Sequence, residues 1–565
     1  MELIEEHHLF LFLIQLLVIL ALARGLGEVC RKFGQPALMA ELAVGIALGP
    51  TILGRYLPGV SELLFPPDAV QVNMLETVAW MGVLFLLLDT GLEIDFSVAW
   101  RQGKRALVIS LADIILPMLI SLVPFLLLSD HFLVDPDRRF LFAVFMATIM
   151  TISAMPETAR VMQDLKLLKT NMGFLVMSAL AINDIIGWVV FSIVLGLFLQ
   201  ATPDLAGIAL VFFGVVGFSA LVLAVGRRLS SRGLDALQRY GVPEPGASLT
   251  FAVVVGLLFG GVTQWLGVHA LFGFFLAGVV VGEARTLAQD TRRIITQMVH
   301  AVFVPIFFVN VGLKIDVLGH FHWGLVILVT VLGVAARYFG AWAGVRMTRA
   351  PQVNRDLIAI AHTPGGVMQI VVGVLALEQN LVTEQVFVAI LFGAVASAVI
   401  MGPWMKLALA RRRRITLADL LVPEGAEADL AATTPEEAIS RLCALAAEEA
   451  DGIELGEIER NVLDREAKYG TALGDGVAVP HVHLDGLRHT LLAVGRSKAG
   501  LEWDAPDGKP VHLVFLLLSP EGANDIHVQT LAQLSRAVAP AEARAALLAA
   551  ETPDAFREAL ADVLD

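Results

Sequence analysis

The sequence predicts a polytopic α-helical membrane protein that continues into a soluble α/β domain. The chain has 565 residues, of which 57% are hydrophobic and only 17% are charged, a composition typical of proteins with many membrane spans. Apolar runs long enough to cross a bilayer as helices recur from residue 8 to residue 410. After residue 416, amphipathic helical stretches alternate with strand-like runs such as Val511–Leu518, which is typical of an α/β domain.

The charge distribution divides the chain near residue 411. The whole chain carries a formal net charge of -14, but the part from residue 416 onward has 27 acidic and 11 basic residues. We therefore expect a transmembrane domain at 1–410, a basic linker at 411–416 and a cytoplasmic domain at 417–565. The arginines of the linker follow an apolar span, where basic clusters usually mark the cytoplasmic side, so they do not indicate nucleic-acid binding.

About thirteen apolar runs are long enough to be membrane helices. They lie near residues 8–25, 37–54, 72–92, 106–129, 140–159, 172–198, 206–226, 247–266, 268–282, 299–313, 322–345, 356–377 and 384–410. Positive charges follow mainly the odd-numbered runs, and Arg138-Arg139 is the clear exception. By the positive-inside rule, the N-terminus is outside and the C-terminal domain is cytoplasmic, in a multi-pass protein of the inner membrane.

The N-terminal residues do not suggest a cleaved signal peptide, and the cysteines do not suggest cross-links. The first six residues are acidic and lack the basic segment of a cleaved signal peptide, so the first run is expected to remain as a membrane helix. Cys30 and Cys443 are far apart and have no companions at metal-ligand spacing. A disulfide framework or a zinc site is therefore not expected.

A short pattern occurs twice, at the ends of the third and the tenth runs. Residues 88–95 read Leu-Asp-Thr-Gly-Leu-Glu-Ile-Asp, and residues 309–316 read Val-Asn-Val-Gly-Leu-Lys-Ile-Asp. An odd number of spans separates the two copies, which gives them opposite orientations, as in an inverted-topology repeat. Chance similarity is the alternative.

The same offset pairs the fifth run with the twelfth, and helix-breaking residues interrupt both. The fifth contains Thr151-Ile152-Ser153-Ala154-Met155-Pro156-Glu157, and the twelfth contains His362-Thr363-Pro364-Gly365-Gly366. Irregular backbone at membrane depth survives only where it is buried in protein or lines a wet cavity. We therefore expect two crossed broken helices whose half-helix ends can hold an ion near the midplane. Two ordinary proline kinks are the alternative.

Charged residues also lie inside the predicted spans. Asp184, which follows Asn183, lies near the middle of the sixth run, where an ionised carboxylate costs about 2.5–3.5 kcal/mol. A chain tolerates this cost where the group has a partner, a proton or a bound cation, so Asp184 is the candidate ion site. A structural polar pair is the alternative. Arg337, deep in the eleventh run, is the candidate for charge compensation unless it snorkels. For Asp89 and Asp113 we do not expect a direct role.

These residues carry a resemblance to a known family. Residues 1–410 resemble the monovalent cation/proton antiporters, which include bacterial sodium/proton exchangers and glutathione-gated potassium efflux systems. The matching segments are Gly34-Gln35-Pro36, Glu41-Leu42-Ala43-Val44-Gly45-Ile46-Ala47-Leu48-Gly49-Pro50, Gly91-Leu92-Glu93-Ile94-Asp95, Asn183-Asp184, and Ala336-Arg337 before Gly340. The resemblance implies a homodimer in membrane lipid, with a core of spans four to six and eleven to thirteen that moves as an elevator. It also implies no cofactor beyond the transported Na⁺ or K⁺ and H⁺.

The resemblance assigns candidate roles by position. Asp184 is similar to the carboxylate that binds the monovalent cation and the proton, and Asn183 is similar to its usual neighbour. Ser153 and Thr151 lie in the unwound segment that would complete the cation shell, and Arg337 resembles the basic residue of the core. Two positions depart from the pattern of many Asn-Asp exchangers. Ala154 stands where they have an acidic residue, and Ala179 stands where they have the glutamate that pairs with the arginine.

An exchange mechanism also follows from the carboxylate itself. If one carboxylate carries either a proton or a monovalent cation, and returns empty only at high cost, exchange is coupled one for one and moves no net charge. We therefore predict electroneutral exchange of Na⁺ or K⁺ for H⁺. The alternatives are a gated potassium efflux system and a phosphotransferase-system component that the membrane part only anchors. The choice between sodium and potassium stays open.

The C-terminal part resembles a second family. Arg465-Glu466, Thr471, Gly476-Val477-Ala478-Val479-Pro480-His481, Asp507-Gly508-Lys509-Pro510-Val511 and His527-Val528-Gln529-Thr530-Leu531 resemble the fructose/nitrogen-type enzyme IIA domain of the sugar phosphotransferase system. The resemblance implies that His481 accepts a phosphoryl group, that His527 is its neighbour, and that a phosphocarrier is a partner. Three interpretations stay open: the domain senses phosphotransferase state through His481, binds a small regulatory ligand, or is a structural relic. His483 is expected to be a solvated loop histidine.

Overall fold

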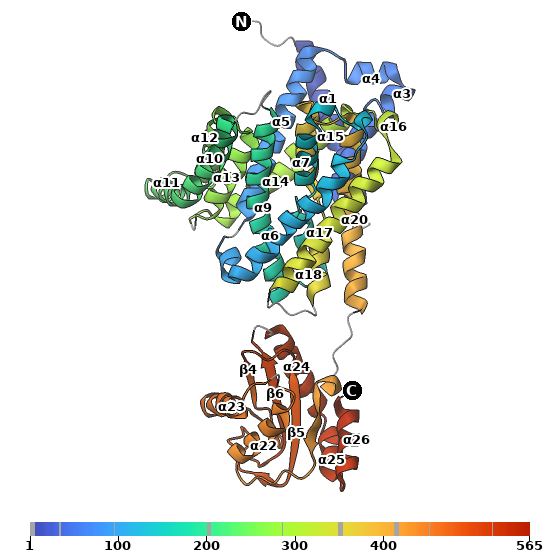
Figure 1. Cartoon of the computed structure of the whole chain (residues 1–565). Helices are drawn as coiled ribbons and strands as arrows, with labels where there is room; N and C mark the ends of the chain where they lie inside the picture. Colours follow the sequence, from blue (N-terminus) through green and yellow to red (C-terminus); the bar gives the residue numbers. More distant parts are fainter. Residues whose placement is uncertain are drawn as a thin grey trace. The chain divides into compact units, whose positions relative to one another are not determined.

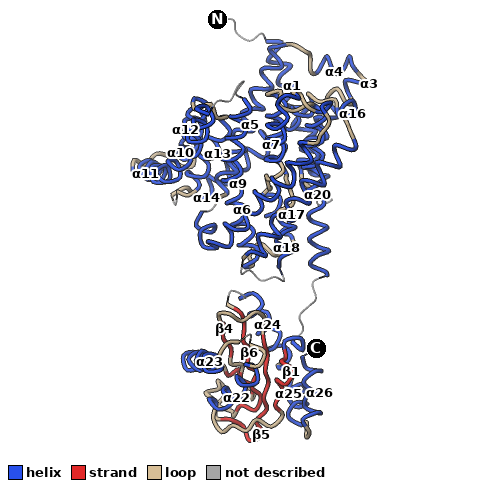
Figure 2. Tube along the Cα trace, viewed as in Figure 1, coloured by secondary structure: helices blue, strands red, loops and turns tan. Residues whose placement is uncertain are grey.

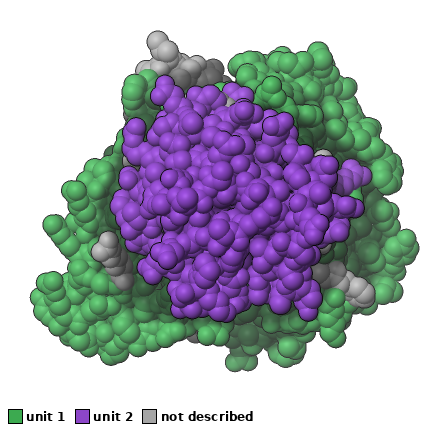
Figure 3. Space-filling model, turned by 90° about the horizontal axis from the view of Figure 1, so that it is seen from below, with its two compact units in different colours: residues 1–409 green, residues 410–565 purple. Residues whose placement is uncertain are grey.

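The chain forms two compact units, residues 1–409 and 410–565, which are coloured separately in Figure 3. The computed structural model describes all residues except 1–5, 33–34, 95, 200–204, 285, 349–353, 412–416, 451, 522–523 and 565. Most of the predicted linker at 411–416 therefore lies outside the described residues, as do Gly34 and Asp95 of the quoted motifs. Each unit is described by itself.

The described residues of the first unit form helices joined by turns and loops, with no strand among them (Figures 1 and 2). Its α-helices are α1 (Glu6–Lys32), α2 (Ala37–Leu48), α3 (Leu53–Tyr56), α4 (Pro58–Leu64), α5 (Ala69–Glu93), α6 (Phe96–Leu126), α7 (Arg139–Ile149), α8 (Met155–Asp164), α9 (Asn171–Leu199), α10 (Leu205–Leu221), α11 (Arg227–Arg239), α12 (Gly246–Trp265), α13 (Ala270–Gly282), α14 (Gln289–Met298), α15 (Val304–Leu313), α16 (Val317–His320), α17 (Trp323–Met347), α18 (Arg355–Ala361), α19 (Gly366–Glu378) and α20 (Glu384–Arg411). Two 3₁₀ turns, η1 (Asp130–Phe132) and η2 (Pro136–Arg138), and two π-helical segments, η3 (Val222–Gly226) and η4 (Val299–Phe303), connect some of them.

Eleven segments of the described chain are long and apolar enough to span a membrane, fewer than the thirteen runs in the sequence. The fifth run is divided between α7 and α8, and the ninth forms α13, which has only 13 residues. The count of thirteen is therefore not confirmed, because a run of apolar residues does not reveal where the helix inside it stops.

The helices differ in how much apolar surface they bury. In the most apolar stretch of Arg355–Glu378, 94% of the residues are buried. In Val211–Arg239 and in Gly246–Trp265 the buried share is 28%. A helix that is apolar all round and enclosed by protein belongs to the interior, whereas an exposed apolar surface of this kind is suited to lipid. The second predicted broken helix thus lies at the centre of the unit.

The second unit is an α/β domain, as the sequence predicts (Figure 2). Its strands are β1 (Leu421–Glu427), β2 (Ala472–Gly474), β3 (Val477–Ala478), β4 (His481–Leu484), β5 (Leu491–Leu501) and β6 (Val511–Pro520), and its helices are α21 (Leu417–Leu420), α22 (Pro435–Ala447), α23 (Leu455–Tyr469), α24 (Asn524–Val538), α25 (Ala541–Ala549) and α26 (Pro553–Leu564). The sheet order is β1-β5-β6-β3-β2, and β4 pairs with β6 in parallel. One apolar cluster includes α22 and α23, and a second includes α24 and α26.

Candidate functional site

The two predicted breaks are present, and they bond to each other. α7 ends at Ile149 and α8 begins at Met155, while α18 and α19 are separated by residues 362–365. The backbone N–H of Ala154 donates to the carbonyl oxygen of Pro364 over 2.8 Å. The hydroxyl of Thr158 donates to the carbonyl oxygen of Ala361 over 2.7 Å. Each break thus satisfies backbone groups of the other, which buried irregular backbone in a membrane requires.

The prolines and glycines of the breaks have separate tasks. Pro156 is the second residue of α8, where its missing N–H is tolerated, so it begins a helix and does not kink one. Gly366 begins α19 with φ +52, and a Cβ there would lie 2.5 Å from both the Cβ of Ala154 and Oε1 of Glu157. A Cβ on Gly365 would lie 2.7 Å from Nη1 of Arg337. The two glycines therefore allow the second break to approach the first.

Arg337 holds the first break from the side of α17. It is 1% exposed, so its side chain does not snorkel to the surface. Nη1 donates to the carbonyl oxygen of Ile152 over 2.5 Å, Nε donates to Gly333 over 2.6 Å, and Nη2 lies 3.4 Å from Oε1 of Gln369. The guanidinium thereby satisfies a carbonyl that the unwound segment leaves without a helical partner.

Asp113, on α6, contacts two of the candidate residues, although the sequence led us to expect no direct role for it. It is fully buried, and its Oδ2 accepts from Nδ2 of Asn183 over 3.1 Å and lies 3.2 Å from Oγ of Ser153. Asp113 and Arg337 also interact electrostatically. The signal was the same as for Asp184, a carboxylate within an apolar run, but its neighbours could not be known before the fold.

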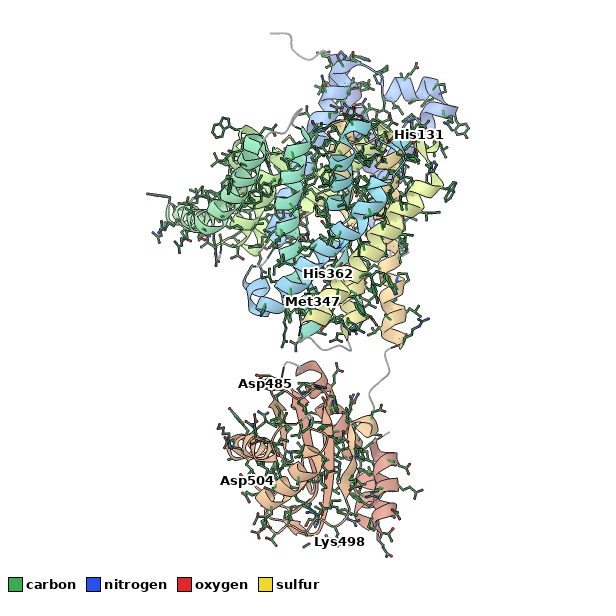
Figure 4. The ribbon with its side chains drawn as sticks, in the orientation of Figure 1. His131, Met347, His362, Asp485, Lys498 and Asp504 are labelled. Carbon is green, nitrogen blue, oxygen red and sulfur yellow. The ribbon has the colours of Figure 1, made fainter. Side chains whose placement is uncertain are left out.

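The hydroxyl groups of Ser153 and Thr151 donate to different partners. Ser153 Oγ also lies 3.1 Å from the carbonyl oxygen of His362, so its single proton is shared between that oxygen and Asp113. Thr151 donates to the carbonyl oxygen of Thr148 over 2.8 Å, within its own turn. Both side chains are buried. Figure 4 labels His362, the residue of the second break that Ser153 reaches.

Asp184 lies on α9 and is 6% exposed. Within the described part of the chain, no other residue forms a hydrogen bond or an ion pair with its carboxylate. Its neighbour Asn183 makes the helix-to-helix bond to Asp113 instead. The charges of Glu157 and Glu93 act on Asp184, and both are negative. Among the described residues, the carboxylate therefore has neither a polar pair nor a positively charged partner.

A cavity of about 930 Å³ lies beside the breaks. Residues of α1, α2, α8, α19, α20 and η4 line it, among them Glu41, Glu157 and Val367. His300 also lines it and pairs with Oδ2 of Asp89 over 3.1 Å, while the hydroxyl of Thr296 donates to the other oxygen. Asp89 is therefore paired with His300 and Thr296.

The second unit brings His481, His527 and Arg465 together. Nδ1 of His481 lies 2.8 Å from the carbonyl oxygen of Val479, and Nε2 lies 2.8 Å from Nη2 of Arg465. Because a guanidinium can only donate, Nδ1 of His481 carries the proton and Nε2 has the lone pair. The rings of His481 and His527 are 5.2 Å apart, and Nδ1 of His527 bonds to Ser519 over 2.8 Å.

Burial favours the neutral forms of the histidines in this cluster. It lowers the pKa of His481 below its usual value, with a smaller lowering from Arg465, and it lowers the pKa of His527 to about 4. His483 was expected in a solvated loop, which is wrong. It lies in β4, its ring is 4.2 Å from that of His527, and its Nε2 is buried. Alternation along the strand brings residues 481 and 483 to the same face.

Comparisons with known proteins agree with both resemblances. Residues 16–411 match the family described as sodium/hydrogen exchanger, transmembrane, and residues 420–563 match the phosphoenolpyruvate-dependent sugar phosphotransferase system, EIIA 2. Cation/H(+) antiporter 18 of Arabidopsis thaliana is 30% identical over 399 residues, which cover 70% of this chain and 48% of that protein. The chain thus spans about half the length of the Arabidopsis relatives that it matches.

Bacterial and archaeal proteins match over nearly their whole length. Na(+)/H(+) antiporter NhaS4 of Synechocystis is 25% identical over 409 residues, which cover 71% of this chain and 97% of that protein. The solved sodium proton antiporter MjNhaP1 from Methanocaldococcus jannaschii shares the fold, with a TM-score of 0.56 at 16% identity over 72% of this chain and 99% of that one. The chain is a multi-pass membrane protein that belongs to the sodium/hydrogen exchanger family and carries an enzyme IIA-type domain.

Proposed function

We propose that the chain exchanges a monovalent cation, Na⁺ or K⁺, for H⁺ at Asp184, and that its enzyme IIA-type domain regulates this exchange. The observation that carries the proposal is the state of Asp184, which is buried and has no partner among the described residues. Leaving a buried carboxylate unpaired is costly, so it is occupied by a proton or by a cation.

The charges around Asp184 support one-for-one exchange. The positive charge of Arg337 acts on Asp113, and the proposal assigns neither residue a change of charge during transport. Asp113 thereby replaces the acidic partner that is missing at Ala179. Asp184 then alternates between the protonated form and the cation-loaded form, which carry the same net charge. Exchange is accordingly electroneutral.

In this proposal Asn183, Ser153 and Thr151 complete the cation shell with oxygen atoms. Asn183 uses its amide nitrogen on Asp113, which leaves its amide oxygen for a cation. The hydroxyl oxygens of Ser153 and Thr151 keep lone pairs after donating their protons. Neutral oxygens and carboxylates are the ligands of hard cations, which fits Na⁺ and K⁺ equally.

The antiporter family also supports a proposal for the number of membrane crossings, the dimer and the orientation of the first unit. α7 with α8, and α13, supply two further crossings beyond the eleven long segments, for thirteen in all with an inverted repeat. The core that contains both breaks moves as an elevator within a homodimer in the inner membrane, with the N-terminus outside and the enzyme IIA-type domain in the cytoplasm. A gated potassium efflux system and a membrane-anchored phosphotransferase component are the alternatives, and an anchor needs no unpaired Asp184.

His481 is proposed as the phosphoryl acceptor of the second unit. Its Nε2 lone pair would form a bond to phosphorus while the bond from phosphorus to the phosphocarrier nitrogen breaks. Nδ1 keeps its proton on the carbonyl of Val479, and Arg465 lies close enough to bind the phosphoryl oxygens. Binding of a small ligand in the same cleft is the alternative.

Proteoliposomes test the exchange and its electroneutrality together. A pH-sensitive dye should report proton movement when Na⁺ or K⁺ is added, with Li⁺ as a third cation, for the whole chain and for a chain without residues 417–565. The proposal expects cation-driven proton flux that persists when the membrane potential is held at zero. A robust cation-driven current at zero potential would count against electroneutral exchange, and cation flux without proton flux would favour a gated efflux system.

A further inference from the structure

Glu157 is a second carboxylate with an unsatisfied oxygen. It lies in the first turn of α8, and its Oε2 is buried with no hydrogen-bond partner among the described residues. Of the charges that act on Asp184, that of Glu157 has the largest effect. Two unpaired anions in a low-dielectric environment repel each other. A positive charge close to both carboxylates would relieve this repulsion.

The other oxygen of Glu157 is held at the ends of two half-helices. Oε1 accepts from the backbone N–H of Val367, the second residue of α19, over 3.1 Å. Glu157 is itself the third residue of α8, and the two helices have 10 and 13 residues. Each helix N-terminus is equivalent to roughly +0.5 elementary charge. Together they supply about one elementary positive charge, which compensates part of the cost of burying the Glu157 carboxylate.

An ion can reach Glu157 from water. Glu157, Pro156 and Val367 all line the cavity of about 930 Å³ beside the breaks. The bond from Val367 fixes one carboxylate oxygen and leaves the other free to bind. Glu157 therefore lies at the cavity wall with one oxygen fixed, and the charge of Glu157 acts on the buried Asp184, which does not line the cavity.

We propose that Glu157 is a second ligand for the transported cation, through Oε2, while Asp184 supplies the other carboxylate. This inference rests on the proposed exchange at Asp184. The antiporter resemblance leads one to expect an acidic residue at position 154, where this chain has Ala154. Glu157 lies about one helical turn after that position. The proposal assigns Glu157 no change of charge between the protonated and the cation-loaded form of Asp184, so exchange stays one for one. The contribution of Glu157 is to cation affinity.

Transport by the full chain in proteoliposomes tests the proposal, with Glu41→Gln as the matched control. Glu41, on α2, lines the same cavity and also has a buried, unpartnered oxygen. In Glu157→Gln, the Na⁺ or K⁺ concentration for half-maximal proton flux should rise on the order of tenfold. The maximal flux and the ratio of one cation exchanged per proton should stay unchanged. An unchanged value, or an equal rise in Glu41→Gln, would overturn the proposal.

Cation binding without transport separates this inference from the proposed function. Na⁺ or K⁺ should raise the Tm of the purified wild-type chain in detergent, because a ligand that binds only the folded state stabilises it. Glu157→Gln should need on the order of tenfold more cation for the same rise, and Glu157→Asp should fall between the two. If Asp184→Asn abolishes exchange while both Glu157 variants bind like wild type, only the role of Glu157 fails. If Asp184→Asn still exchanges, the proposed function itself fails.

Discussion

Asn183 donates its side-chain amide to Oδ2 of Asp113 over 3.1 Å, while the carboxylate of the next residue, Asp184, bonds to none of the described residues. Consecutive residues on a helix point in directions that differ by roughly 100°. One residue of the pair therefore joins α9 to α6, and the other remains available. This division of tasks explains how a buried acid can be held in place without being neutralised by a protein partner.

The interaction of Arg337 with Asp113 should be visible in unfolding. Arg337→Met removes the donor to Ile152 and leaves Asp113 without its positive neighbour. We expect a loss of about 1–3 kcal/mol, because the buried carbonyl of Ile152 loses its donor, measured by thermal unfolding in detergent. The double variant Asp113→Asn/Arg337→Met should lose less unfolding free energy than the sum of the losses in the two single variants. Strict additivity would show that the two residues act independently.

The close approach of the two breaks should depend on Gly366. An alanine there would adopt an unfavourable φ and meet both Ala154 and Glu157, so Gly366→Ala should destabilise the unit by about 1–3 kcal/mol. Gly261→Ala is the control, because it lies in α12 with nothing within 4 Å of an added Cβ. That change should be neutral or stabilising. Equal Tm values for Gly366→Ala and wild type would contradict the described contact.

The histidine cluster should make the second unit sensitive to acid. Burial lowers the pKa of His527 to about 4, from about 6.5 when unfolded. The unfolded state therefore binds more protons, and the stability that neutral His527 contributes is present above pH 6.5 and is lost as the pH falls toward 4.

Hydrogen exchange of the full chain can follow this effect in β4 and β6, after correction for the intrinsic rate at each pH. Protection should fall between pH 7 and pH 4.5, and it should fall less in His527→Gln. An identical pH dependence in the variant would assign the effect to other groups.

Phosphoryl transfer to the second unit should require His481. With the general phosphotransferase proteins and a labelled phosphoryl donor, the wild-type chain should take up label at His481, because its Nε2 carries the lone pair. His481→Gln should remove the label, and the control His483→Gln should retain it. Absence of label on the wild-type chain would reject phosphorylation and favour a small ligand.

The sequence could predict the breaks and the buried charges because each has a local signature. Proline and glycine interrupt a helix wherever they occur within it, and a charge in an apolar run is costly regardless of its neighbours. The α/β character of the second unit was likewise visible in the apolar run that forms β6. Motif spacing then connected both units to their families.

The parts that could not be predicted depend on contacts between distant segments. Asp113 is 40 residues from Ser153 and 70 residues from Asn183 along the chain, so its place in the site required the packing of α6 on α9. The bond from Val367 to Glu157 likewise joins residues 210 positions apart. The count of thirteen spans is not confirmed, because apolar composition alone does not distinguish a long helix from α13 or from the α7–α8 pair.

The most direct measurement is cation-driven proton flux in proteoliposomes containing Asp184→Asn, compared with wild type and with Asp137→Asn, a change of an exposed loop carboxylate. The account predicts that Asp184→Asn is folded and carries no Na⁺- or K⁺-driven proton flux, while Asp137→Asn resembles wild type. Sustained cation-coupled proton flux through Asp184→Asn would contradict it.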